Sequence, residues 1–298
     1  MKLGYPCKNW TIGCTGDRTF RLKSYSEKRM IETISNNLDC LIQMLKFNVE
    51  HHLLFFRITS DLIPFASHPI CTFDWAHYFS DIFLEIGEII QKHQIRISMH
   101  PDQFIVLNSP RFDVVKRSID ELQYHADVLE AMNLPKSAKI QLHVGGVYGD
   151  KEKSMNRFIE VFEGLDDQIK KRLVIENDDS RYMVSDCLNL YNRTGIPLLL
   201  DIFHHSILNN NESVKHVISY SSQTWNASDG VLMLDYSQQE PGKRQGKHAE
   251  TLNLDQFQTF LSTSAPTDFD IMLEIKDKES SALRAINAIK QDARFIGK

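Results

Sequence analysis

Short apolar runs recur along this chain, and each is typical of a buried β-strand. Eight such runs predict strands at 3–6, 52–59, 96–100, 139–143, 172–176, 197–201, 231–235 and 270–274. Between and after them, apolar residues recur with a spacing near 3.6, which predicts helices at 26–49, 74–93, 113–133, 151–169, 181–193, 212–219, 254–262 and 279–291. Four of these helices have candidate caps at or near their first residue, namely Ser26, Asp74, Ser180 and Asn211.

Strand and helix alternate from one end of the chain to the other. This order is typical of parallel α/β folds, either a doubly wound sheet or a (β/α)8 barrel. Eight units within 298 residues favour the barrel and leave no segment for a second domain. We therefore predict an α/β fold, a single (β/α)8 TIM barrel that forms one domain over residues 1–298.

The last six predicted strands all end in a type of residue that binds metals. These residues are His100, His143, Glu176, Asp201, Asp235 and Glu274. Parallel strands of a barrel bring their C-terminal ends to one face, so the six side chains should converge there. Converging carboxylates and imidazoles are how proteins hold divalent cations, and the pattern therefore predicts a metal centre.

Each of these residues has a simpler explanation when it is taken alone. A carboxylate can be neutralised by a lysine such as Lys276, and a lone histidine after a strand is more often a hydrogen-bonded core residue. Four carboxylates at one rim have too few facing cations, however, and unpaired burial costs on the order of several kcal/mol each. As a further ligand we prefer His204, three residues after Asp201, to His205. The support from spacing is weakest for His248, in the loop after the seventh strand.

The donor set contains oxygen and imidazole but no thiolate, which suits Mn²⁺, Mg²⁺, Fe²⁺ or Zn²⁺ in a centre of two or three ions. Such centres cleave phosphodiesters, because one ion converts water to hydroxide while the others stabilise the phosphate and the leaving alkoxide. We assign catalysis to Glu176, Asp201 and Glu274, with Glu176 bridging two metal sites. Sugar isomerisation on a two-metal barrel is the main chemical alternative.

The overall composition restricts the partners and the compartment. A formal net charge of -5 means that any potential attracting nucleic acid must be local. The odd number of cysteines, without a CxxC pair, predicts free thiols in a reducing cytoplasm for Cys7, Cys14, Cys40, Cys71 and Cys187. No apolar run approaches ~18 residues and the first residues do not resemble a signal peptide, so no membrane span is expected.

Two predicted loops at the same face of the barrel carry basic residues. The loop after the first strand holds Lys8, Arg18 and Arg21 among aromatic residues. The loop after the seventh strand holds Lys243 and Arg244 beside glycines. Basic groups with aromatics and flexible backbone suit contacts with phosphates and bases, although either loop alone would be interpreted as a solvated loop.

A third loop, which follows His100, exposes Gln103 and Phe104 above the predicted metal centre. An aromatic ring beside an amide can enter a duplex, where the ring stacks in place of a displaced base and the amide satisfies the orphaned partner. A Phe104 side chain packed inward is the alternative, with nearly equal support. Together, the three loops favour nucleic acid over a small sugar.

Several segments in a fixed order resemble the UV damage endonuclease family over essentially the full length of the chain. They are residues 4–6 with Asn9, 56–61, 98–104, 142–145, 175–178, 200–205, 246–249 and 272–279. The resemblance implies a barrel similar in fold to endonuclease IV, with manganese as the usual ion. It also implies nicking of double-stranded DNA immediately 5′ to cyclobutane pyrimidine dimers and 6-4 photoproducts.

The resemblance further implies roles for individual residues. Gln103 and Phe104 match the pair that probes the DNA, where a tyrosine is common in place of Phe104. Tyr5 and Asn9 match residues that hold the flipped lesion. The implied metal ligands are His100, His143, Glu176, Asp201, His204, His248 and Glu274.

The seventh strand departs from the family pattern. Some members have Lys-x-His there, with a carboxylated lysine in the metal cluster and a histidine ligand, where this chain has Met233 and Asp235. Met233 has no amine to carboxylate, so that feature should be absent. Asp235 is still a candidate ligand, through oxygen instead of nitrogen, and the number of ions is therefore open.

Three alternatives to this function stay open at this point. The first is an abasic-site endonuclease of the endonuclease IV type. The second is a metal-dependent sugar isomerase or epimerase, and the third is a non-catalytic lesion-binding protein with structural metals. For the favoured function we expect a monomer that acts on the nucleoid in the cytoplasm. Its expected partner is double-stranded DNA that contains UV lesions.

Overall fold

The computed structural model describes residues 1–296, and a closed barrel of parallel strands lies at its centre. The strands are β1 (Leu3–Pro6), β2 (Phe55–Ile58), β3 (Arg96–Met99), β4 (Lys139–His143), β5 (Leu173–Glu176), β6 (Leu198–Asp201), β7 (Leu232–Tyr236) and β8 (Phe269–Leu273). Each strand pairs with the next one along the chain, and β1 pairs with β8 at Leu3 and Ile271, which closes the barrel. The predicted (β/α)8 TIM barrel is confirmed.

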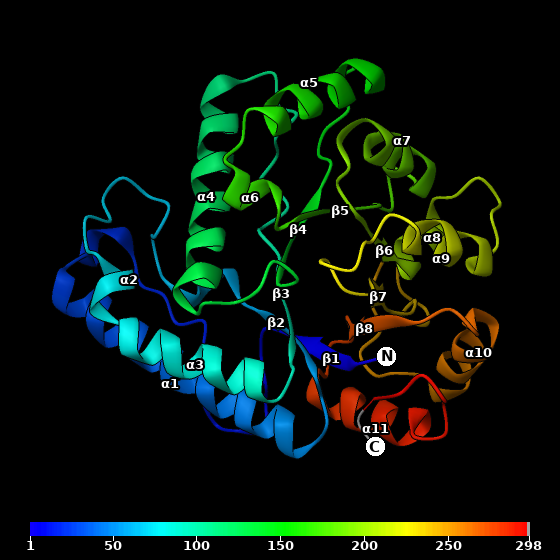
Figure 1. Ribbon diagram of the computed structural model, residues 1–298, viewed down its shortest axis with the longest axis horizontal. Helices are drawn as coiled ribbons and strands as arrows, with labels where there is room; N and C mark the ends of the chain where they lie inside the picture. Colours follow the sequence, from blue (N-terminus) through cyan, green and yellow to red (C-terminus); the bar gives the residue numbers. More distant parts are fainter. Residues whose placement is uncertain (297–298) are drawn as a thin grey trace.

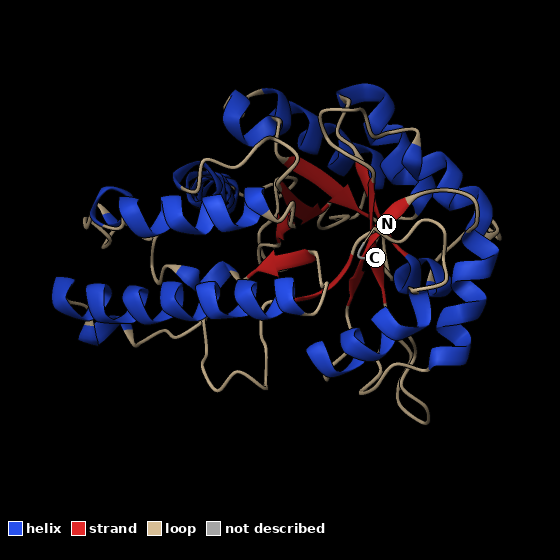
Figure 2. Cartoon of the chain, turned by 60° about the horizontal axis from the view of Figure 1, so that its bottom comes forward, coloured by secondary structure: helices blue, strands red, loops and turns tan. Residues whose placement is uncertain are grey.

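Helices surround the strands on the outside, as Figures 1 and 2 show. Those within the described residues are η1 (Leu22–Ser24), α1 (Glu27–Glu50), η2 (Ser60–Leu62), α2 (Trp75–Tyr78), α3 (Ser80–Lys92), α4 (Phe112–Ala131), α5 (Lys151–Glu163), α6 (Asp167–Lys170), α7 (Val184–Thr194), α8 (Ile202–Ile207), α9 (Val214–Ser222), α10 (Leu254–Ser264) and α11 (Glu279–Ile289). The chain runs round the barrel in sequence order, so its two ends lie close together (Figure 1). There, the backbone N–H of Ile296 donates a hydrogen bond to the carbonyl of Met1 at 3.2 Å.

The sequence predicts two of the four helix caps correctly. The side chains of Ser26 and Asp74 accept hydrogen bonds from backbone N–H groups in the first turns of α1 and α2. Ser180 and Asn211 were wrong as caps, because α7 and α9 begin later in the chain. The predicted helix 74–93 is two helices, since the backbone at Phe79 leaves the helical region between α2 and α3.

The short helix α8 is absent from the sequence-based prediction. It begins directly after Asp201, whose carboxylate accepts a hydrogen bond from the backbone N–H of His204 at 2.7 Å. The six residues of α8 are too few for a 3.6-residue period to stand out from the preceding strand. This cap fixes Asp201 and His204 next to each other at the end of β6.

The barrel interior is built in layers. Phe55, Val174, Leu199, Met233 and Met272 form a separate, fully buried apolar cluster. Side chains along a strand alternate between its two faces, so the residue two positions further along points the same way. The residues two positions beyond these five are Arg57, Glu176, Asp201, Asp235 and Glu274. An apolar floor therefore lies beneath a layer of charged groups at the C-terminal ends of the strands.

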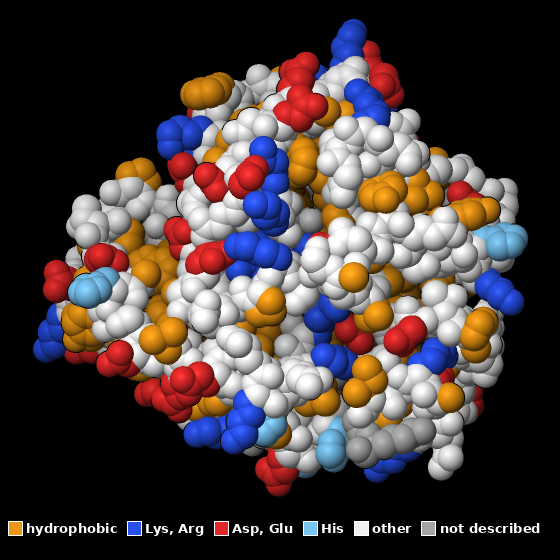
Figure 3. Space-filling view, viewed as in Figure 1, with side chains coloured by type: hydrophobic (Ala, Val, Ile, Leu, Met, Phe, Trp, Pro, Cys, Tyr) orange, Lys and Arg blue, Asp and Glu red, His pale blue; other side chains and the backbone are white. Residues whose placement is uncertain are grey.

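Charges of both signs are intermixed on the outer surface. On the face drawn in Figure 3, basic and acidic side chains lie side by side over α4 and α6. Ion pairs such as Lys136–Glu130 and Lys170–Asp167 belong to this pattern. Within the part of the chain that is described, no helix combines the length and apolar character needed to span a bilayer.

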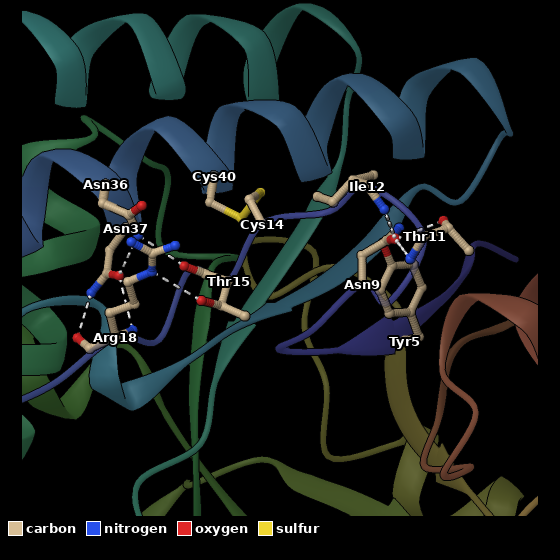
Figure 4. The surroundings of a disulfide bond; sticks show 10 residues. All are labelled: Tyr5, Asn9, Thr11, Ile12, Cys14, Thr15, Arg18, Asn36, Asn37 and Cys40. Atoms are coloured by element: carbon tan, nitrogen blue, oxygen red, sulfur yellow. Dashed lines mark hydrogen bonds between the residues drawn. A yellow bond between two sulfur atoms is a disulfide. The ribbon is translucent and has the colours of Figure 1, made fainter.

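The loop between β1 and α1 is joined to α1 by a disulfide between Cys14 and Cys40 (Figure 4). Their Cα atoms lie 5.8 Å apart. The prediction of free thiols is therefore wrong for this pair, while Cys7, Cys71 and Cys187 are free. An odd cysteine count excludes only complete pairing, and it carries no information about a loop that folds back along a helix.

Gly87 allows α3 to lie against the chain that follows α4. A Cβ atom added to Gly87 would lie 1.9 Å from the carbonyl oxygen of Met132. We predict that Gly87→Ala lowers the free energy of unfolding by about 1–3 kcal/mol, because the helix must shift to relieve this overlap. The matched control is Gly164→Ala, whose Cβ would meet no atom closer than 3.5 Å. Urea denaturation of both variants tests this, and an unchanged midpoint for Gly87→Ala would contradict it.

Candidate metal centre

Glu176 lies at the centre of the barrel mouth, with histidines on both sides. It is the last residue of β5 and is 2% exposed. One carboxylate oxygen lies 3.4 Å from Nε2 of His100 and 3.6 Å from Nε2 of His143, and the other lies 3.2 Å from Nδ1 of His204. The strands thus bring together residues that are far apart in the sequence, and a single carboxylate faces three imidazoles.

Three groups of side chains in this mouth have ligand atoms close enough to hold a metal ion. The ligand atoms within each group lie within 4.8 Å of one another. The groups are His100, His143 and Glu176; Glu176, Asp201 and His204; and Asp201, Asp235 and Glu274. Glu176 and Asp201 each belong to two groups, so neighbouring ions would share a carboxylate. The buried clusters can therefore bind metal.

The donor atoms fit a divalent cation. The Oδ2 atom of Asp201 is buried and accepts no hydrogen bond from the described residues, although Nδ1 of His204 lies 3.4 Å from it. A buried carboxylate oxygen without a donor is unfavourable, and a bound cation removes this penalty. The remaining donors are imidazole nitrogens and carboxylate oxygens, the ligands that suit manganese, magnesium, iron and zinc.

Arg57 occupies one side of the mouth and was not anticipated from the sequence as a site residue. It is 3% exposed, and its Nη2 donates to the two carboxylate oxygens of Asp235 at 2.8 and 2.7 Å. Its Nη1 forms an ion pair with Glu274. The predicted ligand Asp235 belongs to the third group, but both of its carboxylate oxygens already accept hydrogen bonds from Arg57. Arg57 supplies a fixed positive charge on that side.

Gln141 connects the two sides of the mouth. Its side-chain oxygen accepts a hydrogen bond from Arg57 at 2.7 Å. Its Nε2 donates to Glu176 at 2.5 Å and to Asp235 at 2.6 Å. Because all these groups are buried, this network restricts the positions of the two carboxylates.

The pKa values of the buried groups report the balance of charge. Burial raises the pKa of Asp201 to about 7, with an opposing effect of His204 and a further increase from Glu176. Burial opposes the charged form of His204, but Asp201 and Glu176 raise its pKa to about 11. Burial also lowers the pKa of His100 to about 3, which keeps this imidazole neutral, the form that binds metals. The centre thus favours an added positive charge beside its carboxylates.

His248 and His205 have different positions. The His248 ring packs edge-on against Phe203 with centroids 5.0 Å apart, and its Nδ1 lies 3.0 Å from the carbonyl oxygen of Glu274. It borders the mouth but lies outside the three groups. His205 points away, with its Nε2 3.1 Å from the carbonyl of Glu212. His204, by contrast, belongs to one of the three groups.

Gln103 and Phe104 lie at the tip of the loop after β3, and Phe104 is 68% exposed. The inward-packed alternative for this ring is therefore wrong. Gln103 and His248 line two hollows at the mouth. The larger, about 720 Å³, reaches His143 and His204, and the smaller, about 340 Å³, is lined by Arg57, His100, Glu274, Lys276 and Lys278.

The five basic residues predicted to contact DNA lie outside these hollows. Lys8 forms an ion pair with Asp17. The backbone N–H of Arg18 donates to Asn37 on α1 at 2.9 Å, which holds this part of the loop in place (Figure 4). Arg21, Lys243 and Arg244 are exposed. These residues lie on loops that flank the mouth, as predicted, but not next to the carboxylates.

Tyr5 and Asn9 are buried, at 0% and 3% exposure. The Tyr5 hydroxyl donates to Asn48 at 2.7 Å and accepts from Asn9 at 2.8 Å. The Asn9 side-chain oxygen accepts from the backbone N–H of Thr11 at 2.9 Å (Figure 4). In this conformation the pair fixes the loop after β1 and does not face the hollows, so contact with a nucleotide requires the loop to move.

Arg57 provides a direct test of the charge balance. We predict that Arg57→Met lowers the free energy of unfolding of the metal-free protein by about 3–5 kcal/mol, because it leaves Asp235 and Glu274 without their cation. Saturating Mn²⁺ should restore part of this loss, since it binds the same carboxylates in the folded state. Urea denaturation with and without Mn²⁺ measures both effects.

The control is Arg193→Met, at an exposed residue of α7 that pairs with Glu152. Exposed pairs contribute little, so this change should stay within about 0.5 kcal/mol of the wild type. Wild-type stability for Arg57→Met would show that the buried ion pairs do not matter to folding.

A closed (β/α)8 barrel whose strand ends gather histidines and carboxylates in overlapping groups is typical of one class, the TIM-barrel enzymes with candidate metal sites. Comparison with known families is more specific. The family described as UV-endonuclease UvdE matches residues 1–295. The chain therefore belongs to the UvdE family of UV damage endonucleases, which are DNA phosphodiester hydrolases, and the family resemblance seen in the sequence is confirmed.

Individual relatives agree with this result. The UV DNA damage endonuclease of Clostridium perfringens (strain 13 / Type A) is 37% identical over 293 residues, which are 98% of this chain and 71% of the relative. The crystal structure of SacUVDE is 49% identical, with a TM-score of 0.94 over 98% of both chains. Endonuclease IV from Thermus thermophilus has a TM-score of 0.55 at 14% identity, over 83% of this chain and 93% of that one, a likeness that shows the fold alone.

Proposed function

We propose that this protein nicks double-stranded DNA immediately 5′ to UV lesions, both cyclobutane pyrimidine dimers and 6-4 photoproducts. Family membership supports UV damage as the substrate class. The observation that carries the chemistry is Glu176, whose carboxylate has three histidine nitrogens within 3.6 Å at the barrel mouth. We further propose that residues 1–298 form one endonuclease domain and that the protein acts as a monomer in the cytoplasm.

Two or three divalent cations are proposed as the cofactor, with Mn²⁺ preferred over Zn²⁺, Mg²⁺ and Fe²⁺. When bound, such ions lower the pKa of water and stabilise negative charge on the phosphate and the leaving oxygen. The proposed ligands are His100, His143, Glu176, Asp201, His204, Asp235, His248 and Glu274. Glu176 and Asp201 are the shared ligands, and together with Glu274 they are the residues assigned to catalysis.

The protein's own groups position these ligands. Gln141 holds Glu176 by a hydrogen bond of 2.5 Å, and the backbone N–H of His204 holds one oxygen of Asp201 at 2.7 Å. Arg57 holds Glu274 and lies at the wall of the smaller hollow. A phosphate that enters this hollow would therefore approach ligands that are already oriented, which lowers the entropic barrier to reaction.

The exposed loops are proposed to bind the damaged duplex. Gln103 and Phe104 project at the tip of their loop, where the ring can stack in the helix and the amide can pair with an orphaned base. Contacts with the DNA backbone on either side are assigned to Lys8, Arg18, Arg21, Lys243 and Arg244. Tyr5 and Asn9 would meet a flipped lesion only after the loop that follows β1 opens.

Removal of the shared carboxylate tests the chemistry. We predict that Glu176→Gln reduces nicking of irradiated plasmid by at least about a hundredfold, because the amide keeps the shape but loses the charge that would bridge two ions. Glu163→Gln, at an exposed glutamate that ends α5, is the matched control and should nick normally. Circular dichroism confirms that both variants are folded. Near-normal nicking by Glu176→Gln would exclude the proposed mechanism.

The lesion preference distinguishes the proposal from an abasic-site enzyme. We predict faster nicking of a duplex with one cyclobutane dimer than of the same duplex with one abasic site, and no nicking in the presence of chelator. Rates are measured on end-labelled DNA with saturating Mn²⁺. A preference for the abasic site would favour the endonuclease IV type of function, and tight binding without cleavage would favour a lesion-binding protein.

A further inference from the structure

The turn from β8 into α11 lies beside the metal centre, and the proposed function leaves it without a role. It holds Lys278, whose backbone has φ 51° and ψ −116°. Positive φ is uncommon for a residue with a side chain, and it persists where the surrounding structure enforces it. The structure around Lys278 must therefore hold this turn in its conformation.

Contacts with two neighbouring loops fix the turn. The backbone N–H groups of Lys276 and Asp277 donate to the carbonyls of Ala249 and Glu250, each at 3.1 Å. Next to Lys278, the fully buried Glu279 accepts a hydrogen bond from the backbone N–H of Trp10 at 2.9 Å. The turn is thus held from the loop after β7 and from the loop after β1, and the backbone around Lys278 has little freedom.

The Lys278 side chain lines the smaller hollow, together with Arg57, His100 and Glu274. Within residues 1–296 its ammonium group has no carboxylate within 4.0 Å and no hydrogen-bond partner. Other lysines in protected positions are paired: Lys139 with Asp229 at 2.5 Å, for example. A partly enclosed ammonium without a partner, in a hollow that leads to the metal centre, is a site for an anion.

The surroundings of Lys278 support this interpretation. Burial lowers the pKa of its ammonium, and the negative charge of Glu274 opposes this effect while the positive charge of Arg57 adds to it. Partial desolvation strengthens the attraction for an anion that reaches the group. The anion that this enzyme handles is the phosphodiester of DNA, with oxygen atoms that accept hydrogen bonds from lysine.

We propose that Lys278 binds a phosphate oxygen of the DNA strand that is cut, at the scissile phosphate next to the metal centre. This inference rests on the proposed function, because it takes the phosphodiester in the hollow as the substrate. Lys278 and Arg57 then supply two fixed positive charges to one side of the phosphate. The proposed metal ligands His100 and Glu274 line the same hollow, so a phosphate there would lie next to the metal centre as well as to these charges.

The test uses binding in the presence of chelator, so that its outcome does not depend on metal or on cleavage. The variants are Lys278→Gln, Lys278→Arg and the control Lys290→Gln, at an exposed lysine just beyond α11. Fluorescence anisotropy with a duplex that carries one cyclobutane dimer gives Kd over a range of salt concentrations. Lys278→Gln should weaken binding about tenfold. It should also make the negative slope of the logarithm of the binding constant against the logarithm of the salt concentration shallower by about one, as expected for one lost phosphate contact. Lys278→Arg and Lys290→Gln should keep the wild-type slope.

Two further measurements examine the contact between Lys278 and the phosphate. The first identifies the phosphate, and the second uses only the wild-type protein, so that a folding defect in a variant does not affect it. An uncharged methylphosphonate at the scissile position should weaken binding by the wild type but have little further effect on Lys278→Gln. In the wild-type protein, bound DNA should protect Lys278, but not Lys290, from acetylation, as read by mass spectrometry. An unchanged slope for folded Lys278→Gln, or equal acetylation of Lys278 with and without DNA, would overturn the proposal. If the wild type binds DNA and Lys278 is protected but no lesion is nicked, the proposed function fails and the phosphate contact stands.

Discussion

Buried negative charge at the barrel mouth is the constraint on which the rest of this structure depends. Glu176, Asp201 and Asp235 are at most 2% exposed, and Glu274 lies beside them. The fully buried apolar cluster beneath them leaves no path to solvent through the floor. Ionised carboxylates in such a place are stable only with cations or donors close by. The protein meets this requirement with Arg57 on one side and offers histidines and open ligand atoms on the other.

This division makes the two sides of the mouth chemically different. Beside Arg57, the pKa of Glu274 falls to about 2 despite its burial, so the carboxylate is held ionised by a fixed guanidinium. Asp201 faces His204 instead of a guanidinium, and there burial raises the carboxyl pKa to about 7 although His204 opposes this rise. Gln141 donates to a carboxylate on each side and so links the two sides. The need for an added cation is therefore concentrated around Glu176 and Asp201, where the histidines lie.

The sequence predicts the barrel and most of the centre, because both follow from strand periodicity. A strand that ends in His, Asp or Glu presents that residue at the mouth once the strands are parallel. Strand ends do not predict Arg57 and Gln141, because these residues lie within apolar runs. A single polar residue there does not indicate its partners across the barrel. The disulfide and the burial of Tyr5 also depend on how one irregular loop folds against α1, and no periodic pattern encodes such a path. Contacts between distant segments are thus the part that sequence reasoning misses.

The same charge balance bears on how a polyanion can reach the centre. A mouth lined by carboxylates repels a phosphate, and Lys8 and Arg244 of the flanking basic loops line neither of the two hollows that lead to it. The smaller hollow is lined by Arg57, Lys276 and Lys278 together with Asp102 and Glu274, whereas the larger is lined by Asp178 and Asp179 with Arg181. The phosphate should therefore enter through the hollow with the basic groups. Bound cations at Glu176 would complete the neutralisation and support hydrolysis of the phosphate.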